Sequence, residues 1–198
     1  MIKSISFIIA LLVISTLAQP DTTYKDGKGC GGCDSISREY FPESGRIECE
    51  NPYLNGQIHG IAKEYFESGI LESEWTLYKG VTQGLMKVYY ESGELKSETI
   101  YANDEEQGIQ KVYYESGALW AERPLVNGLE HGAQKVYYES GTLWAEMPYD
   151  KGNKHGTEKQ YNKLGKLVGT SKFRNDTLIG YVQCIDGRKG NESLDCTN

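Results

Sequence analysis

Turn residues recur in this chain at a fixed spacing of 24 residues, and this regularity limits the possible folds more than any other feature. The tripeptide Glu-Ser-Gly ends at Gly45, Gly69, Gly93, Gly117 and Gly141, and Gly165 continues the series. A second column holds Gly60, Gly84, Gly108, Gly132, Gly156 and Gly180, and a third holds Gly56, Gly80, Asp104, Gly128, Gly152 and Asp176. Such a period indicates tandem units that are stabilised by stacking on their neighbours.

Each unit has the pattern of one β-hairpin. Two apolar runs, such as residues 110–114 and 118–125, are separated by a turn. Between the turns runs an aromatic column, which holds Phe41, Tyr65, Tyr89, Tyr113, Tyr137 and Tyr161. Six hairpins give about 12 antiparallel strands, or about 58 Å of sheet at about 4.8 Å between strands. The sequence therefore predicts an all-β protein, an elongated single-layer antiparallel sheet of about six tandem repeats.

The turn chemistry also predicts the strand register. A three-residue connection that closes on glycine suits a type I turn followed by a left-handed residue. This connection places Tyr113 opposite Leu119, Lys111 opposite Ala121 and Ile109 opposite Arg123. A two-residue loop would instead shift the pairing by one residue and place Lys111 opposite Glu122.

The repeat unit resembles a known family. The pattern Tyr-Tyr-Glu-Ser-Gly-x-Leu, followed by Asn-Gly and a further glycine, is similar to MORN (membrane occupation and recognition nexus) repeats, and most of all to a bacterial variant, some members of which are described as antitoxins of toxin–antitoxin pairs. In the fourth unit the match is carried by Tyr113, Tyr114, Gly117, Leu119, Gly128 and Gly132. The resemblance implies a protein-interaction scaffold, with lipid binding proposed for some members.

The two ends of the chain differ from the array. Residues 1–18 combine Lys3, an uncharged run from Ser4 to Leu17 and small residues at Thr16 and Ala18, as a secretory signal peptide does. We expect a polar segment with a Cys-x-x-Cys pair at 19–36, the repeat array at 37–180 and a C-terminal cap at 181–198. The mature protein would then be exported, to the periplasm or the medium.

The charged residues do not indicate catalysis. The net charge of −7 lacks the basic footprint of a nucleic-acid-binding protein. Lysine and glutamate recur in every unit as a solvated face would, whereas a catalytic group is usually unique. The columns are Lys63, Lys87, Lys111, Lys135 and Lys159, and Glu50, Glu74, Glu98, Glu122 and Glu146. We predict no enzyme activity, no cofactor and no metal, since His59, His131 and His155 lie too far apart along such a sheet to share an ion.

Aromatic residues are the candidate binding groups. Tyrosine and tryptophan bury large areas at low entropic cost and suit interfaces. The candidates are Tyr89, Tyr113, Tyr137, Trp120 and Trp144, although the same side chains could simply pack the sheet. The sequence thus favours an exported, non-enzymatic scaffold for protein–protein interaction. The alternatives are a binder of envelope glycans or lipid headgroups and an antitoxin or immunity partner of a toxin.

Five cysteines in an exported chain are first of all candidates for disulfides. Cys184 and Cys196 could close the C-terminal cap, and Cys49 could pair with Cys30 or Cys33. The fifth cysteine would then be free or would bridge two chains. Two alternatives remain open. One is a redox pair at Cys30 and Cys33, and the other is a zinc site that adds Cys49 and His59 to that pair.

The disulfide interpretation predicts that alkylation without prior reduction labels at most one cysteine, the fifth one, and labels none if that cysteine bridges two chains. Mass measurement of the purified protein before and after alkylation checks this. Five free thiols would exclude disulfides.

Overall fold

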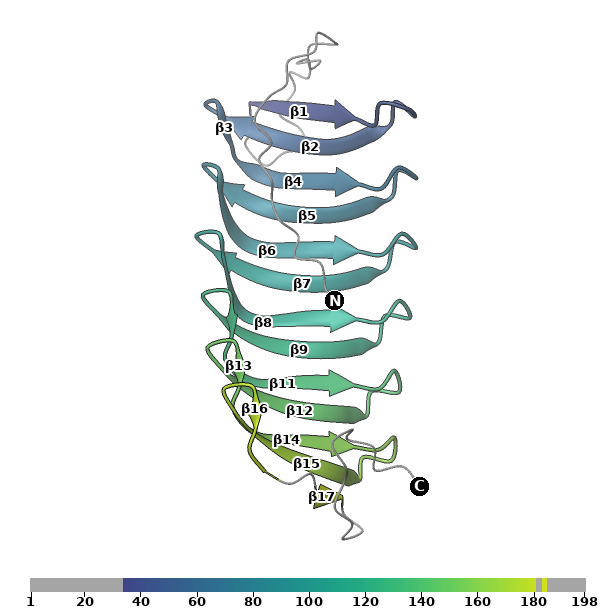
Figure 1. Cartoon of the computed structure of the whole chain (residues 1–198). Coiled ribbons are helices and arrows are strands. Elements are labelled where there is room, and N and C mark those ends of the chain that lie inside the picture. Colours follow the sequence, from purple (N-terminus) through teal and green to yellow (C-terminus); the bar gives the residue numbers. More distant parts are fainter. Residues whose placement is uncertain (1–33, 181–182, 185–198) are drawn as a thin grey trace.

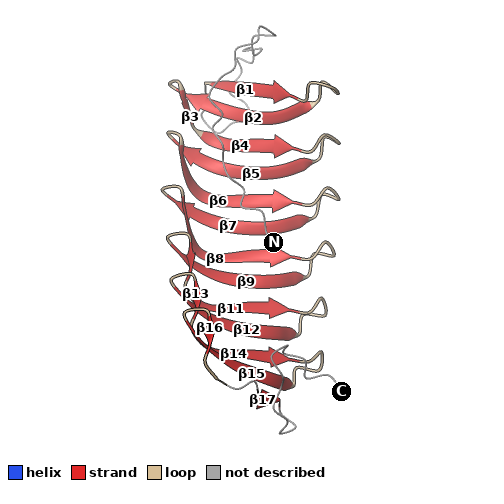
Figure 2. Ribbon diagram, viewed as in Figure 1, coloured by secondary structure: helices blue, strands red, loops and turns tan. Residues whose placement is uncertain are grey.

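The computed structural model describes residues 34–180 and 183–184, and the described chain is built of strands and turns (Figure 2). The 17 strands form one sheet. They are β1 (Ser35–Tyr40), β2 (Ile47–Leu54), β3 (Gln57–Ile58), β4 (Gly60–Tyr65), β5 (Leu71–Tyr78), β6 (Val81–Tyr89), β7 (Leu95–Ala102), β8 (Glu105–Tyr113), β9 (Leu119–Val126), β10 (Leu129–Glu130), β11 (Gly132–Tyr137), β12 (Leu143–Asp150), β13 (Asn153–Lys154), β14 (Gly156–Tyr161), β15 (Leu167–Arg174), β16 (Thr177–Leu178) and β17 (Gln183–Cys184).

Twelve of these strands are long, and they pair antiparallel with their sequence neighbours to form six successive hairpins (Figure 1). Pairing within a hairpin, as between β8 and β9, alternates with pairing between hairpins, as between β9 and β11. The predicted all-β, elongated sheet of about six tandem hairpins is confirmed. None of the described residues belongs to a helix of the length and apolarity that crossing a membrane requires.

Two kinds of turn close the hairpins. At one end the Gly117 amide donates to the Tyr114 carbonyl, and the Tyr114 amide donates to the Ala118 carbonyl, as in the expected three-residue loop. At the other end both central residues have positive φ, for example 50° at Asn127 and 72° at Gly128, which defines a two-residue type I′ turn. Asparagine and glycine are the residues that adopt this conformation at least cost.

The tips of the type I′ turns are bonded from one unit to the next. The Gly128 amide donates to the Glu106 carbonyl at 2.9 Å, and the Gly152 amide donates to the Glu130 carbonyl at 2.8 Å. In the third unit the Asp104 carboxylate also accepts the Thr82 amide at 2.7 Å. These bonds continue the contact between hairpins beyond the ends of the long strands.

The register prediction holds at the turn and is wrong further along the strands. Tyr113 does pair with Leu119, but a β-bulge follows and Val112 then pairs with Ala121. Trp120 is the extra residue of the bulge. Beyond it Lys111 lies opposite Glu122 rather than Ala121, and Ile109 lies opposite Pro124 rather than Arg123. The loop length alone does not reveal the extra residue, because a bulge changes the register without changing the turn.

The first hairpin departs from the 24-residue spacing. Its loop is one residue longer, since the Phe41 amide bonds to the Arg46 carbonyl, whereas the corresponding loop of the second unit spans Phe66 to Ile70. Tyr40 therefore pairs with Ile47 in the place that Tyr65 occupies in the second unit. The assignment of Phe41 to the column of Tyr65 is wrong for this reason.

The best-buried side chains lie on one face of the sheet. Ala62, Ala121 and Ala145 are 0%, 1% and 2% exposed. Each is the strand neighbour of a lysine or glutamate of the charged columns, and neighbouring residues in a strand point to opposite faces. Other buried members are Ser73, Leu77, Thr99, Leu125, Gln134, Val136, Glu158 and Ser171. The sheet thus has a buried face of mostly small side chains and a charged face.

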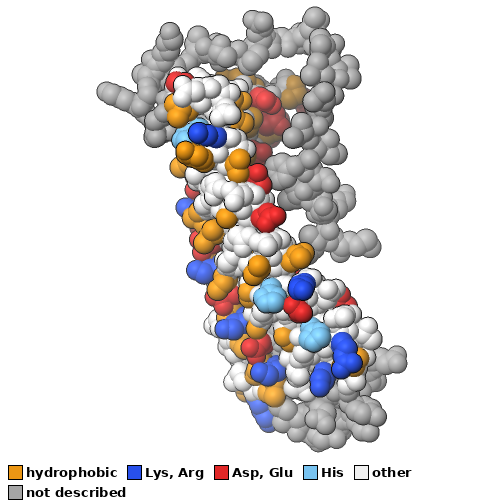
Figure 3. Space-filling model, turned by 90° about the vertical axis from the view of Figure 1, so that its left-hand side faces the viewer, with side chains coloured by type: hydrophobic (Ala, Val, Ile, Leu, Met, Phe, Trp, Pro, Cys, Tyr) orange, Lys and Arg blue, Asp and Glu red, His pale blue; other side chains and the backbone are white. Residues whose placement is uncertain are grey.

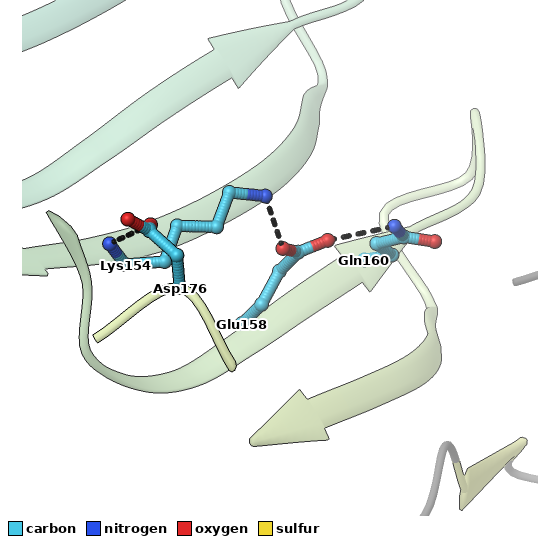
Figure 4. Close-up of polar contacts among 4 residues, drawn as sticks. All are labelled: Lys154, Glu158, Gln160 and Asp176. Carbon is cyan, nitrogen blue, oxygen red and sulfur yellow. Dashed lines mark hydrogen bonds and ion pairs between the residues drawn. The ribbon is translucent and has the colours of Figure 1, made fainter. Parts of the chain in front are cut away.

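The buried face becomes polar near the C-terminal end of the array (Figure 4). Glu158, only 4% exposed, accepts hydrogen bonds from Lys154 Nζ at 3.0 Å and Gln160 Nε2 at 2.9 Å. The Lys154 amide in turn donates to Asp176 Oδ1 at 2.7 Å. The ammonium and the amide compensate the buried carboxylate, as burial of a charge requires.

Glycine is required where the strand leaves the type I′ turn. Gly156 has φ +117°, and a Cβ placed there would lie 3.0 Å from Cγ of Pro148. Gly141 has φ +84° with nothing within 4 Å of such a Cβ. We expect Gly141→Ala to lower the free energy of unfolding by about 1–2 kcal/mol through backbone strain alone. Gly156→Ala should cost more, because steric overlap adds to the strain. Equal urea midpoints for the two variants would contradict this.

Candidate binding surfaces

Lysine and glutamate alternate strand by strand across the charged face and form a continuous charge ladder. Lys87 lies between Glu74 and Glu98, and Lys111 lies between Glu98 and Glu122. The full ladder is Arg38, Glu50, Lys63, Glu74, Lys87, Glu98, Lys111, Glu122, Lys135, Glu146 and Lys159. Acidic and basic side chains alternate down the left-hand edge of the view in Figure 3.

Neighbours in the ladder form ion pairs. Arg38 Nε lies 2.7 Å from Glu50 Oε1, and Lys159 Nζ lies 3.1 Å from Glu146 Oε2. Lys87 and Lys111 lie 3.4 Å from Glu74 and Glu98. The bulge causes this arrangement, because the register without it would set Lys111 against Ala121. The spacing of the two columns predicts a solvated face, but it does not predict that lysine and glutamate interleave.

Tyrosine hydroxyls of the aromatic column bind the glutamates of the ladder. The Tyr113 hydroxyl donates to Glu98 at 2.8 Å, and Tyr89 and Tyr137 donate to Glu74 and Glu122 at 2.9 Å. Burial, reinforced by these hydrogen bonds, raises the pKa of Tyr89, Tyr113 and Tyr137 to about 12. These three predicted binding residues therefore take part in a network within the sheet.

The same network begins in the first hairpin. Tyr65 donates to Glu50 Oε2 at 2.9 Å, and Arg38 donates to Glu50 Oε1. Burial opposes ionisation of Glu50, but the hydrogen bonds from Arg38 and Tyr65 outweigh it and lower the pKa of this carboxyl group. The ladder is thus neutralised locally although the whole chain is acidic.

A second tyrosine column forms an aromatic row beside the three-residue loops. The hydroxyls of Tyr90, Tyr114 and Tyr138 donate to the backbone carbonyls of Tyr113, Tyr137 and Tyr161, at 2.7, 2.8 and 3.0 Å. Each bond links one hairpin to the next. The Trp120 ring meets Tyr114 with centroids 6.5 Å apart, and Trp144 meets Tyr138 at 6.3 Å. We call Tyr90, Tyr114, Trp120, Tyr138 and Trp144 the aromatic row.

The predicted aromatic strip is therefore divided between two networks. Tyr89, Tyr113 and Tyr137 bind the charge ladder, whereas Trp120 and Trp144 contact the tyrosine that follows in each Tyr-Tyr pair. Tyr90, Tyr114 and Tyr138 are not among the site residues predicted from the sequence. Their own spacing of 24 residues was the signal that could have found them.

Apolar side chains are exposed on the charged face between the ladder and the type I′ turns. Ile61, Leu85 and Ile109 each lie two residues before a ladder lysine, and Ile100 lies opposite Leu85. Their exposed fractions run from 41% to 53%. In the fifth and sixth hairpins Ala133 and Thr157 take the place of Ile109. The apolar stripe lies on β4, β6, β7 and β8, and Tyr78 on β5 and Val126 on β9 are further exposed side chains where those strands reach the type I′ turns.

The candidate metal and redox residues are only partly described. Cys30, Cys33 and Cys196, like the predicted signal peptide, lie outside the described residues, and only the backbone of Cys184 is placed. Cys49 forms no disulfide with a described residue, and burial raises the pKa of its thiol. In the described part of the chain no three His, Cys, Asp or Glu side chains are grouped as a metal site would need.

The histidines are separated as expected from their spacing. The His131 ring lies 3.2 Å from the Asp150 carboxylate, and the His155 ring lies 3.2 Å from the Asn175 amide oxygen. The His59 ring packs against Tyr78. Each ring therefore contacts a residue near the type I′ turn that follows it.

The repeats match a family model. The model of the MORN repeat variant matches four successive segments, residues 58–79, 82–103, 106–127 and 130–151. The chain carries four tandem MORN repeats of the variant type. Each matched segment holds one three-residue loop and ends in a type I′ turn. No curated protein matches the chain.

The charge ladder of the MORN repeats extends beyond the matched segments. The β1–β2 and β14–β15 hairpins lie on either side of them and have the same bulged register. The ladder is continued there by Arg38 and Glu50 in the first hairpin and by Lys159 in the last. The structure therefore describes six MORN-like hairpins.

The tyrosine–glutamate bonds predict a dependence of stability on pH. A phenol whose pKa is raised on folding adds stability that is fully present below the unfolded value, about 10, and is lost as the pH rises through the folded value, about 12. We expect Tyr113→Phe to cost about 1 kcal/mol at pH 8 and to weaken the loss of stability between pH 10 and 12. Urea unfolding across this range measures both effects, and an unchanged pH profile would contradict the assignment.

Proposed function

We propose that this protein is an exported, non-enzymatic scaffold that binds another protein through the aromatic row. MORN repeats are commonly scaffolds for interaction with proteins or membranes, which supports the general class. The observation that carries the choice of surface is the fixing of Tyr114 and Tyr138 by hydrogen bonds to the next hairpin.

Anchored aromatic rings suit protein recognition for an energetic reason. Ordering a free side chain on binding costs about 0.5–1.5 kcal/mol, and a side chain that is already ordered avoids most of this cost. The tyrosines are held by their hydroxyls, and Trp120 and Trp144 pack against them. Trp144 remains 43% exposed, so part of its side chain is accessible to a partner.

The row also varies from unit to unit in a way that suits specificity. In the third hairpin the place of tryptophan is taken by Lys96, whose ammonium lies 5.5 Å from the Tyr90 ring centre. In the fourth hairpin tryptophan is present as Trp120, and the Arg123 guanidinium lies 5.9 Å from the centre of its ring. A partner with acidic groups near its apolar anchors would match this end of the row, because both cations lie beside aromatic rings.

Glycan binding is the second candidate, because the exposed Trp144 ring offers a flat apolar surface to a sugar. Binding to lipid headgroups and a role as antitoxin or immunity protein remain further alternatives. They differ from the leading proposal in the ligand and can be distinguished by a direct assay.

The experiment is selection of peptides from a random display library on the purified protein, followed by affinity measurement. We expect Trp120→Ala with Trp144→Ala to weaken the selected peptides at least about tenfold, as loss of two aromatic anchors does. Val126→Ala with Leu129→Ala, two exposed side chains at a type I′ turn, is the matched control and should leave the affinity unchanged. Binding to a glycan array or to vesicles, with no peptide selected, would favour the alternatives instead.

A further inference from the structure

The charges of the ladder are arranged so that the ladder is complementary to a second, inverted copy of itself. Its signs alternate strictly from Arg38 to Lys159, one charge per long strand. A two-fold axis that lies in front of the charged face, parallel to the strands and midway between two adjacent strands, maps every basic position onto an acidic one. A second copy of the same face is therefore electrostatically complementary wherever the two ladders overlap.

We propose that two copies of this protein associate through their charged faces, related by a two-fold axis between β6 and β7. The axis places Lys87 of one copy over Glu98 of the other, and Glu74 over Lys111. Lys63 then faces Glu122. Such a self-complementary patch is what an isologous dimer requires.

The apolar stripe lies close to this axis. Its exposed members lie on β4, β6, β7 and β8, centred on the β6–β7 hairpin. The proposed rotation sets Leu85 over Ile100 of the second copy and Ile109 over Thr76. In the outer aromatic column Tyr89 would face Leu95. Leu85 and Ile100 thus meet across the axis, while the charges of the ladder meet opposite charges.

The two overlapping faces are comparable in size to a standard interface. The ten long strands that overlap, β1 to β12, are about 4.8 Å apart and each contributes about 20 Å of length, which gives a projected area of roughly 1,000 Å². A standard interface buries about 800 Å² on each partner. The twist of the two sheets will limit close contact to the strands nearest the axis, where the apolar stripe lies.

The experiment uses two charge-reversal variants that are complementary only to each other. Glu98→Lys sets Lys87 against a lysine of the second copy, and Lys87→Glu sets two glutamates together. We expect the wild type to sediment as a dimer and each variant alone to dissociate at least about tenfold more readily. An equimolar mixture of the two variants restores opposite charges at both positions and should sediment as a heterodimer.

Two further variants test the apolar part of the interface. Leu85→Lys should dissociate the dimer, whereas Leu129→Lys changes a similarly exposed leucine, 51% against 41%, at a type I′ turn and should not. Trp120→Ala with Trp144→Ala should also leave the dimer intact, which separates this inference from the proposed function. A wild-type monomer at all concentrations, or a mixture of folded charge variants that stays monomeric, would overturn the proposal.

Discussion

Backbone pairing between successive hairpins is the interaction on which the rest of this structure depends. A lone two-stranded hairpin is at best marginally stable in water, and the six-fold repetition supplies each inner hairpin with a partner on both sides. The pairing of β9 with β11 is assisted by the bond from the Gly152 amide to the Glu130 carbonyl and by the Tyr114 hydroxyl on the Tyr137 carbonyl. Both of these bonds join neighbouring hairpins, so the stability of a unit cannot be separated from that of its neighbours.

The β-bulge after each three-residue loop determines what the two faces display. With one extra residue at Trp120, Lys111 and Glu122 become opposite neighbours on the same face, and the small residue Ala121 turns to the buried face. One irregularity per unit therefore produces both the charge ladder and a tightly packed opposite face. The same bulge occurs in every hairpin from β1–β2 to β14–β15, so the two faces keep the same character along the whole array.

The structure separates two surfaces that could serve different partners. The aromatic row is anchored by hydrogen bonds from tyrosine hydroxyls to the backbone and is suited to binding a different protein. The charge ladder has the symmetry of an isologous contact between two copies of the chain. Because the proposed dimer covers the face with Tyr113 and leaves Trp144 on the loop side, one copy could use both surfaces at once. A dimer would then offer two aromatic rows to its partners and increase the effective affinity.

The sequence by itself determined the number of hairpins, the turn positions and the all-β class, because glycine at a positive φ and period-two apolar runs are local requirements. It also placed Tyr113 opposite Leu119. Only the tertiary structure decided that Lys111 faces Glu122, that the first loop is one residue longer and that Tyr114 rather than Tyr113 meets Trp120. These features depend on a bulge and on contacts between hairpins, and neither has a local residue code: the extra residue can be accommodated at several positions, and packing of the whole ladder selects one.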